Sequence, residues 1–224
     1  MSRKYVLLLL FLLSLLGFIY FSYLVHTRFL NQFDFNTTVK LQSNIPRNWD
    51  LFFSFFTTLA SPEFSVIAWL GIFTYTLIKK YWHTSVGLLL FFVSVVVELF
   101  GKIFLYHPGP PQLFYRNIVR FDLLPSNFVH TDYSYPSGHV TRTAFLFTFI
   151  LLWIFFKTAS YKRILLGATL VLFYMSMLIS RVYLGEHWTT DIVGGALLGT
   201  SLGFLSAITI PFINKASYSF NKKG

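Results

Sequence analysis

Residues 5–25 read YVLLLLFLLSLLGFIYFSYLV, an uncharged apolar run that follows Arg3 and Lys4. A run of this length can cross the hydrocarbon core of a bilayer as a helix. A cleaved signal peptide has the same order of charge and apolar residues, but its apolar region is shorter and a small-residue cleavage site follows it. The run is too long for that alternative and no A-x-A site follows, so we expect an uncleaved membrane anchor.

The composition of the whole chain is typical of a membrane protein. Of its 224 residues, 55% are hydrophobic and 12% are charged, whereas soluble domains carry about 25% charged residues. The net charge is +10, but the basic residues punctuate apolar runs and form no contiguous stripe, so we expect no nucleic-acid partner. Cysteine is absent, which excludes disulfides and thiolate metal sites.

Five further segments have, or nearly have, the length of a membrane helix. The first of them begins at Ser61-Pro62-Glu63, where a capping Ser, a first-position Pro and a first-turn acid mark a helix start. Segment 49–59, WDLFFSFFTTL, is apolar but short, and we expect it to lie along the bilayer surface. We predict one all-α polytopic membrane domain over 1–224, a six-transmembrane-helix bundle with a short interfacial helix in its first outer loop. The predicted spans are 5–25, 62–78, 84–106, 139–156, 164–180 and 187–212.

The basic residues in the short connections indicate an orientation. Lys and Arg are enriched on the cytoplasmic side of membrane proteins. Lys79, Lys80 and Lys157 then lie inside together with Arg3 and Lys4, while the longer connections with most of the acids lie outside. We expect a plasma-membrane protein with both termini in the cytoplasm.

Ionisable residues near membrane depth are costly and indicate function. Four such clusters stand at the ends of predicted spans, and the predicted topology places all four at the outer face. They are Glu98 and Lys102, Ser137 and His139, Arg181, and His187 with Asp191.

The cations and the start of the fourth span suit an anionic phosphate. Lys102 and Arg181 supply positive charge, and an Arg can hold two oxygens at once. Helix N-termini direct free N–H groups at anions, and Ser137-Gly138 stands at such a terminus. Phosphoryl transfer requires mainly this positioning and charge. We therefore expect Lys102, Ser137, Gly138 and Arg181 to bind a phosphate.

The two histidines suit nucleophilic and acid–base roles. His187 and Asp191 are four residues apart and share one helix face. A carboxylate that holds one imidazole nitrogen leaves the other free to attack, so His187 is the expected nucleophile and His139 the general acid, then base. Glu98, Glu186 and Asp191 lie on separate helices or faces, so we expect no metal and no other cofactor.

The same residues also have purely structural interpretations. Glu98 precedes Lys102 by four residues and is expected to be its ion-pair partner, and Lys102 could extend toward the headgroups. Arg181 could be an anchor at the end of a span. The remaining histidines are expected in loops or at the interface: His26, His83, His107 and His130.

Two motifs carry a resemblance to a known family. Residues 136–139 read Pro-Ser-Gly-His, and residues 180–191 read SRVYLGEHWTTD, in which Ser-Arg is followed by His after five residues and by Asp after three more. In this order they resemble the phosphatidic acid phosphatase type 2 family of membrane lipid phosphatases, related in active site to vanadium-dependent haloperoxidases. The resemblance covers about residues 61–212, the expected catalytic core.

A third motif of that family is incomplete. The family pattern is Lys, six residues, then Arg-Pro, and residues 101–111 read GKIFLYHPGPP. Lys102 and Pro110 fit, but Gly109 stands at the Arg position, which removes one phosphate-binding cation. A shifted reading puts His107-Pro108 in place of the pair. The candidate replacements for the arginine are Arg116, Arg120 and Arg142, of which Arg142 is nearest to His139 in the chain.

The resemblance implies an activity and its partners. It implies metal-independent hydrolysis of a lipid phosphate or diphosphate through a phosphohistidine, at a site facing out of the cytoplasm. The implied substrates are undecaprenyl diphosphate, phosphatidylglycerol phosphate or phosphatidic acid, and the bilayer is the only other partner, with the oligomeric state left open. The same residues also fit two alternatives, a lipid phosphotransferase that uses the same histidine and a non-enzymatic protein that binds or transports lipid headgroups.

Overall fold

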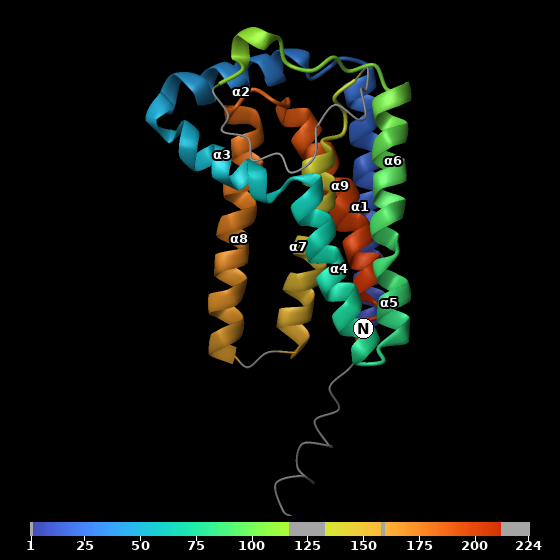
Figure 1. Ribbon diagram of the computed structural model, residues 1–224. Helices are drawn as coiled ribbons and strands as arrows, with labels where there is room; N and C mark the ends of the chain where they lie inside the picture. The colour runs from blue at the N-terminus through green and yellow to red at the C-terminus, as the bar shows by residue number, and fades with distance from the viewer. Residues whose placement is uncertain (1, 117–132, 158–159, 212–224) are drawn as a thin grey trace, which may run out of the picture.

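The computed structural model describes residues 2–116, 133–157 and 160–211, and every regular element in these ranges is a helix. The long helices run side by side, and α2 and α3 lie across one end of the bundle (Figure 1). The helices are α1 (Arg3–His26), α2 (Asn31–Asn44), α3 (Asp50–Leu59), α4 (Pro62–Ile78), α5 (Trp82–Leu88), α6 (Leu90–Phe104), α7 (Gly138–Lys157), α8 (Ser160–Tyr183) and α9 (Thr189–Ala207), with short 3-10 turns at Arg47–Trp49 and Gln112–Phe114.

Five helices of the described chain are long and apolar enough to cross a membrane. α5 and α6 together form one of them, and the others are α1, α7, α8 and α9. α4 is shorter, and it joins the segment Arg47–Leu59 in a pair bent by 45°, which brings the number of spans to as many as six. The predicted all-α polytopic bundle is confirmed, with the second predicted span belonging to a bent pair.

The connection between the first two spans contains two helices where the sequence predicted one. The predicted interfacial segment 49–59 corresponds to α3, which places Phe53, Ser54 and Thr57 on its buried side. α2 was not predicted, because its sequence NQFDFNTTVKLQSN has no apolar periodicity. Its buried residues, Asp34 and Thr38, are polar. Asp34 accepts hydrogen bonds from the N–H and the hydroxyl of Thr190, which join this helix to the start of α9.

α7 and α9 form the centre of the bundle and pack against each other most extensively. Gly195, Gly199 and Gly203 form a row on α9 at intervals of four residues. A Cβ at Gly195 would stand 2.7 Å from the Ser137 carbonyl oxygen, and one at Gly203 would stand 2.8 Å from Thr148 Cβ. Small residues at this spacing let two membrane helices approach closely. The glycine row thereby fixes the position of α9 relative to the first turn of α7.

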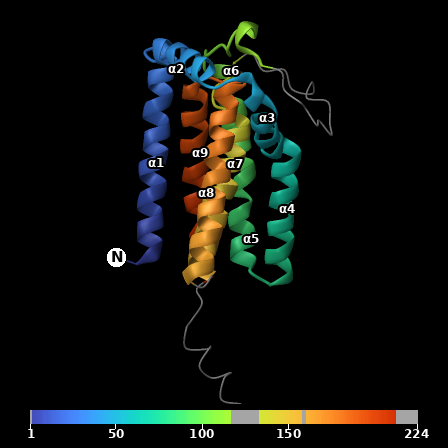
Figure 2. The same cartoon turned by 90° about the vertical axis from the view of Figure 1, so that its left-hand side faces the viewer.

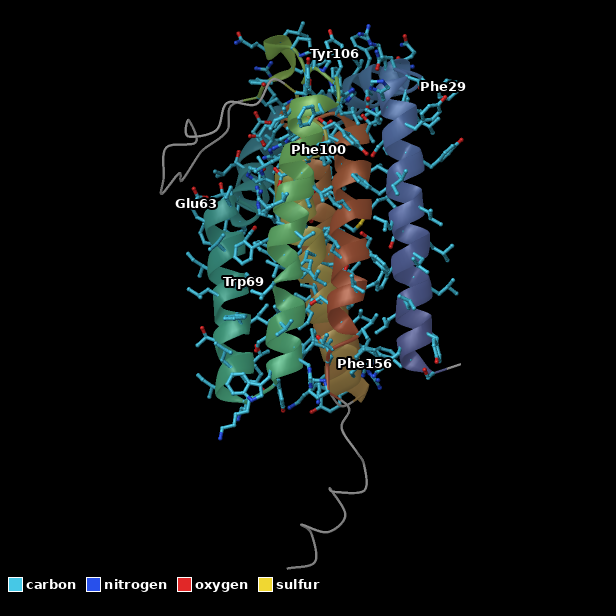
Figure 3. All side chains as sticks on the ribbon, turned by 90° about the vertical axis from the view of Figure 1, so that its right-hand side faces the viewer. Phe29, Glu63, Trp69, Phe100, Tyr106 and Phe156 are labelled. Carbon is cyan, nitrogen blue, oxygen red and sulfur yellow. The ribbon has the colours of Figure 1, made fainter. Side chains whose placement is uncertain are left out.

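The two ends of the bundle are chemically different. At one end, Arg3 donates to the Ile210 carbonyl at 2.5 Å and so joins the start of α1 to the segment after α9. Phe156 lies toward this end, whereas Phe29 and Tyr106 lie at the opposite end (Figure 3). That opposite end is the one covered by α2 and α3 (Figure 2). Thr190, near the start of α9, contacts Asp34 of α2, so the histidine motifs lie under this cover.

Candidate active site

A direct main-chain contact joins the two histidine motifs. The Ser137 N–H donates to the Asp191 carbonyl at 3.0 Å. Gly194 faces the Tyr135 ring so closely that a Cβ there would overlap it. These contacts hold the first turns of α7 and α9 side by side, which brings together two segments that lie far apart in the sequence.

His187 and Asp191 form the predicted hydrogen-bonded pair. Asp191 Oδ2 lies 3.0 Å from His187 Nδ1 and also accepts the Trp188 N–H at 3.0 Å. With Nδ1 donating to the carboxylate, Nε2 of His187 keeps its lone pair. Burial, and next the charge of Arg181, hold the pKa of His187 well below its usual range. The ring is therefore neutral at pH 7, the form that can act as a nucleophile.

The other side of Asp191 contacts a second buried imidazole. Asp191 Oδ1 accepts from Ser134 Oγ at 3.2 Å and lies 3.5 Å from His107 Nε2. The same His107 nitrogen lies 3.1 Å from Thr190 Oγ1 and 3.8 Å from Asp34 Oδ2. The prediction that His107 is a loop or interface residue was therefore incomplete, because its ring is buried behind the His187–Asp191 pair.

Asp34 completes this group from α2. It accepts the Thr190 N–H at 2.9 Å and the Thr190 hydroxyl at 2.7 Å. Burial raises the pKa of Asp34 to about 6, and burial lowers the pKa of His107. The sequence signal for these two residues was weak: a polar helix without periodicity, and the shifted His107-Pro108 reading.

The predicted cations converge on the two histidines. The charges of Arg181, Arg142 and Lys102 act on the His139 ring, as does His187. Those of Arg181 and Lys102 also act on His187. Residues from α6, α7 and α8, together with the connection before α9, therefore meet in one place. This convergence is what the predicted phosphate site requires.

Glu98 joins two of these cations. Its Oε1 lies 2.9 Å from Lys102 Nζ, and its Oε2 lies 2.8 Å from an Arg142 guanidinium nitrogen. The expected Glu98–Lys102 pair is therefore present, and Arg142 adds a second cation to the same carboxylate. Gly138 lies directly against this carboxylate, and a Cβ at that position would overlap it. The absence of a side chain at Gly138 thus lets Glu98 approach the first turn of α7.

A residue of the covering helix α3 contacts Arg181. Arg181 donates to Thr57 Oγ1 at 2.6 Å and forms an ion pair with Glu186. Thr57 belongs to α3, so one of the two covering helices positions a predicted phosphate-binding cation.

Arg116 occupies a different place from the one a phosphate-binding residue would need. Its guanidinium donates to the Gln42 carbonyl at 2.6 Å and to the Tyr183 hydroxyl at 2.7 Å, and it lies 3.5 Å from Asp50. These contacts fasten the α2–α3 connection to the end of α8. Arg120, the other candidate from this stretch, lies outside the described residues, as does His130, which was expected in a loop or at the interface.

The segment with the incomplete motif lies beside both histidine motifs. The Pro108 carbonyl accepts the Trp188 ring N–H at 2.9 Å, and the His107 carbonyl accepts the Ser134 N–H at 3.0 Å. A Cβ at Gly109 would meet Ser134 Cβ at 3.5 Å, an ordinary contact. Position 109 therefore lies close to the site and has room for a Cβ atom.

The donor set gives no place for a metal in the described residues. No group of three or more His, Asp or Glu side chains in ranges 2–116, 133–157 and 160–211 is arranged to hold one. The arrangement instead combines a neutral imidazole, a second imidazole and several cations, which is suited to attack on an anionic phosphorus.

Residues 82–215 match the PAP2 superfamily. The chain therefore belongs to the PAP2 superfamily, and the predicted family is confirmed.

Relatives with assigned names match parts of the chain. An undecaprenyl-diphosphatase of Sulfolobus acidocaldarius is 36% identical over 97 residues, which cover 39% of this chain and 43% of that protein. A dihydrosphingosine 1-phosphate phosphatase of Schizosaccharomyces pombe is 28% identical over 173 residues, 73% of this chain and 39% of that protein. The chain thus spans less than half the length of these curated relatives.

A solved structure resembles the whole chain. The transmembrane PAP2-type phosphatidylglycerolphosphate phosphatase of Bacillus subtilis superposes with a TM-score of 0.66 at 24% identity, covering 95% of this chain and 96% of that one. At 24% identity this structural similarity shows that the two chains share a fold.

Proposed function

We propose that this protein hydrolyses phosphate or diphosphate groups on membrane lipids through a phosphohistidine at His187. The observation that carries the proposal is the 3.0 Å contact between His187 Nδ1 and Asp191, beside His139 and a group of cations. Matched relatives whose names specify an undecaprenyl diphosphatase and a phosphatidylglycerophosphatase support the same chemistry.

The first step forms a bond between His187 and phosphorus. His187 Nε2 attacks the phosphorus and the bond to the lipid-side oxygen breaks, while His139 donates a proton to that leaving oxygen. Lys102 and Arg181 balance the charge on the remaining phosphoryl oxygens. Ser137 and the N–H groups that open α7 contribute donors at the same place, because a helix start leaves its first N–H groups without intrahelical acceptors.

The second step releases phosphate. His139, now without its proton, accepts one from a water molecule whose oxygen attacks the phosphorus. The bond between phosphorus and His187 Nε2 breaks, and inorganic phosphate leaves. Asp191 stabilises the histidine in both steps by accepting from Nδ1. The residues provide all the proton transfers, so we infer that the reaction is metal-independent.

The position of the site suits a lipid substrate. The histidine motifs lie at the end of the bundle that α2 and α3 cover (Figure 2). Many large apolar side chains are exposed along the long helices, so a headgroup can reach the site while its chains remain in the bilayer. The substrate classes that we propose are undecaprenyl diphosphate, phosphatidylglycerol phosphate and phosphatidic acid. We further propose a plasma-membrane location with cytoplasmic termini and an extracytoplasmic site.

Phosphate release from detergent-solubilised protein tests the proposal. The three lipid phosphates would be assayed with EDTA present and without an added acceptor, comparing the native protein with His187→Ala. His83→Ala is the matched control, because His83 is exposed at the start of α5, far from the histidine motifs. We expect turnover of at least one lipid by the native and His83→Ala proteins and none by His187→Ala. A fully active His187→Ala protein would exclude the nucleophile, activity that required added metal would exclude the metal-free mechanism, and release only on adding a hydroxyl acceptor would indicate a phosphotransferase.

A further inference from the structure

The family motif places an arginine where this chain has Gly109, and the structure offers a replacement from another helix. We propose that Arg142, held by Glu98, supplies the phosphate-binding cation that is missing at position 109. This inference rests on the proposed function, because it concerns the same phosphate.

Glu98 positions Arg142 together with Lys102. Its two oxygens contact Lys102 Nζ at 2.9 Å and the Arg142 guanidinium at 2.8 Å, so one carboxylate sets the positions of two cations. Both cations also act on the His139 ring. Since the two positive charges face one negative charge, this part of the site keeps a net positive charge for an anionic ligand.

Two buried polar atoms near the start of α7 have no hydrogen-bond partner in the described part of the chain. Arg142 Nε and Ser137 Oγ are both buried, and neither has a hydrogen-bond partner among the described residues. The exposed fraction is 9% for Arg142 and 0% for Ser137. Buried polar groups without partners are rare in folded proteins. Ser137 directly precedes α7 and Arg142 lies one turn after its start, so these two atoms indicate a place where a ligand with acceptor oxygens binds.

Arg116, the other candidate among the described residues, is engaged elsewhere. Arg116 is taken up by carbonyl and hydroxyl groups at the α2–α3 connection. Arg142 follows His139 by three residues on α7 and so lies over the same helix start. Of the two candidates that the structure describes, Arg142 is therefore the one with a charge near His139 and an unpaired Nε for the phosphate.

Moving the arginine back to its family position tests the replacement. In Arg142→Met, Glu98 keeps its ion pair with Lys102, so no buried carboxylate is left alone. The space beside Gly109 accepts a Cβ at 3.5 Å from Ser134, so Arg142→Met can be combined with Gly109→Arg. Arg142→Lys keeps the charge and removes the planar fork.

The experiment measures kcat/KM on the best lipid phosphate and inhibition by vanadate, a phosphate-like probe, in detergent. We expect Arg142→Met to lose roughly 10²- to 10³-fold in kcat/KM, the loss typical of one charge-stabilising donor. Arg142→Lys should lose less, and the double variant Arg142→Met/Gly109→Arg should regain at least about tenfold. Vanadate should inhibit Arg142→Met more weakly than it inhibits the native protein.

The outcomes separate this inference from the proposed function. Arg142→Met with native kcat/KM and native vanadate inhibition, while His187→Ala is inactive, would overturn the replacement and leave the proposed function standing. An active His187→Ala protein would overturn the proposed function itself. Size-exclusion elution and thermal unfolding report whether each variant folds. If Arg142→Met does not fold, Arg142→Lys decides, and unchanged vanadate inhibition in that folded variant would overturn the inference.

Discussion

The two carboxylates behind the His187 ring and the two donors of the α7 start differ in how far they are hydrogen-bonded. On the supporting side, Asp191 and Asp34 accept hydrogen bonds from several donors. On the binding side, Arg142 Nε and Ser137 Oγ are buried without a partner among the described residues. A side chain with all of its hydrogen bonds formed is held in one orientation, whereas a buried donor without an acceptor can bind a ligand oxygen. Under the proposed function, the hydrogen-bonded carboxylates orient the nucleophile and the unpaired donors bind the phosphate.

Asp191→Asn changes the hydrogen bond between the Asp191 carboxylate and His187 Nδ1. An Asn amide can donate to Nδ1, which would move the proton to Nε2 and remove the attacking lone pair. We expect kcat to fall roughly 10²- to 10⁴-fold without complete loss, as in other His–carboxylate pairs. Asp50→Asn is the matched control, because Asp50 lies at the same end and contacts Tyr183 at 2.6 Å. Equal losses in the two variants would show that the effect is structural.

His107→Gln weakens the second layer of the supporting side. His107 touches Asp191 and Thr190 but no group that we assign to the phosphate, so its loss should change the orientation of Asp191 and not substrate binding. We expect kcat to fall about tenfold with KM unchanged, the size typical of outer supporting contacts. A rise in KM with an unchanged kcat would show that His107 acts in substrate binding, and would contradict its assignment to the residues that orient His187.

Asp34→Asn tests whether the buried Asp34 carboxylate makes the stability of the protein depend on pH. Burial raises the pKa of Asp34 to about 6 in the folded protein, above its ordinary value of 3.8. The folded state then binds more protons than the unfolded state between these values, so stability should decrease as pH rises from about 4 to about 6. Asp34→Asn should remove this part of the decrease in thermal unfolding scans. An identical pH profile for the variant and the native protein would show that Asp34 ionises normally.

The sequence predicted the parts of the site that lie within motifs. His139, His187 and Asp191 were identified from fixed spacings, and the Glu98–Lys102 pair from its separation of four residues. Helices such as α1 and α7 were predicted because a long apolar run has few other structures available to it in a membrane. The incomplete motif showed that a cation was missing and left three candidates for its replacement.

The supporting side could not be predicted in the same way. Asp34 meets Thr190 across 156 residues of sequence, and α2 has no apolar pattern from which its position could be inferred. Arg142 and Glu98 are 44 residues apart on different helices. Such contacts depend on how α7, α9 and the covering helices pack. The row Gly195, Gly199 and Gly203, spaced at four residues, was the available sign of that packing.

A phosphoryl group on His187 is the most direct test of the account. His139→Ala removes the base for the second step, while an aryl phosphate with a good leaving group does not need the acid for the first step. Mass spectrometry of alkaline-quenched His139→Ala protein should therefore find the phosphoryl group on the peptide that contains His187, and not in His139→Ala/His187→Ala. Turnover of the aryl phosphate by His139→Ala with no phosphorylated His187 at any time, or with the group on another residue, would contradict it.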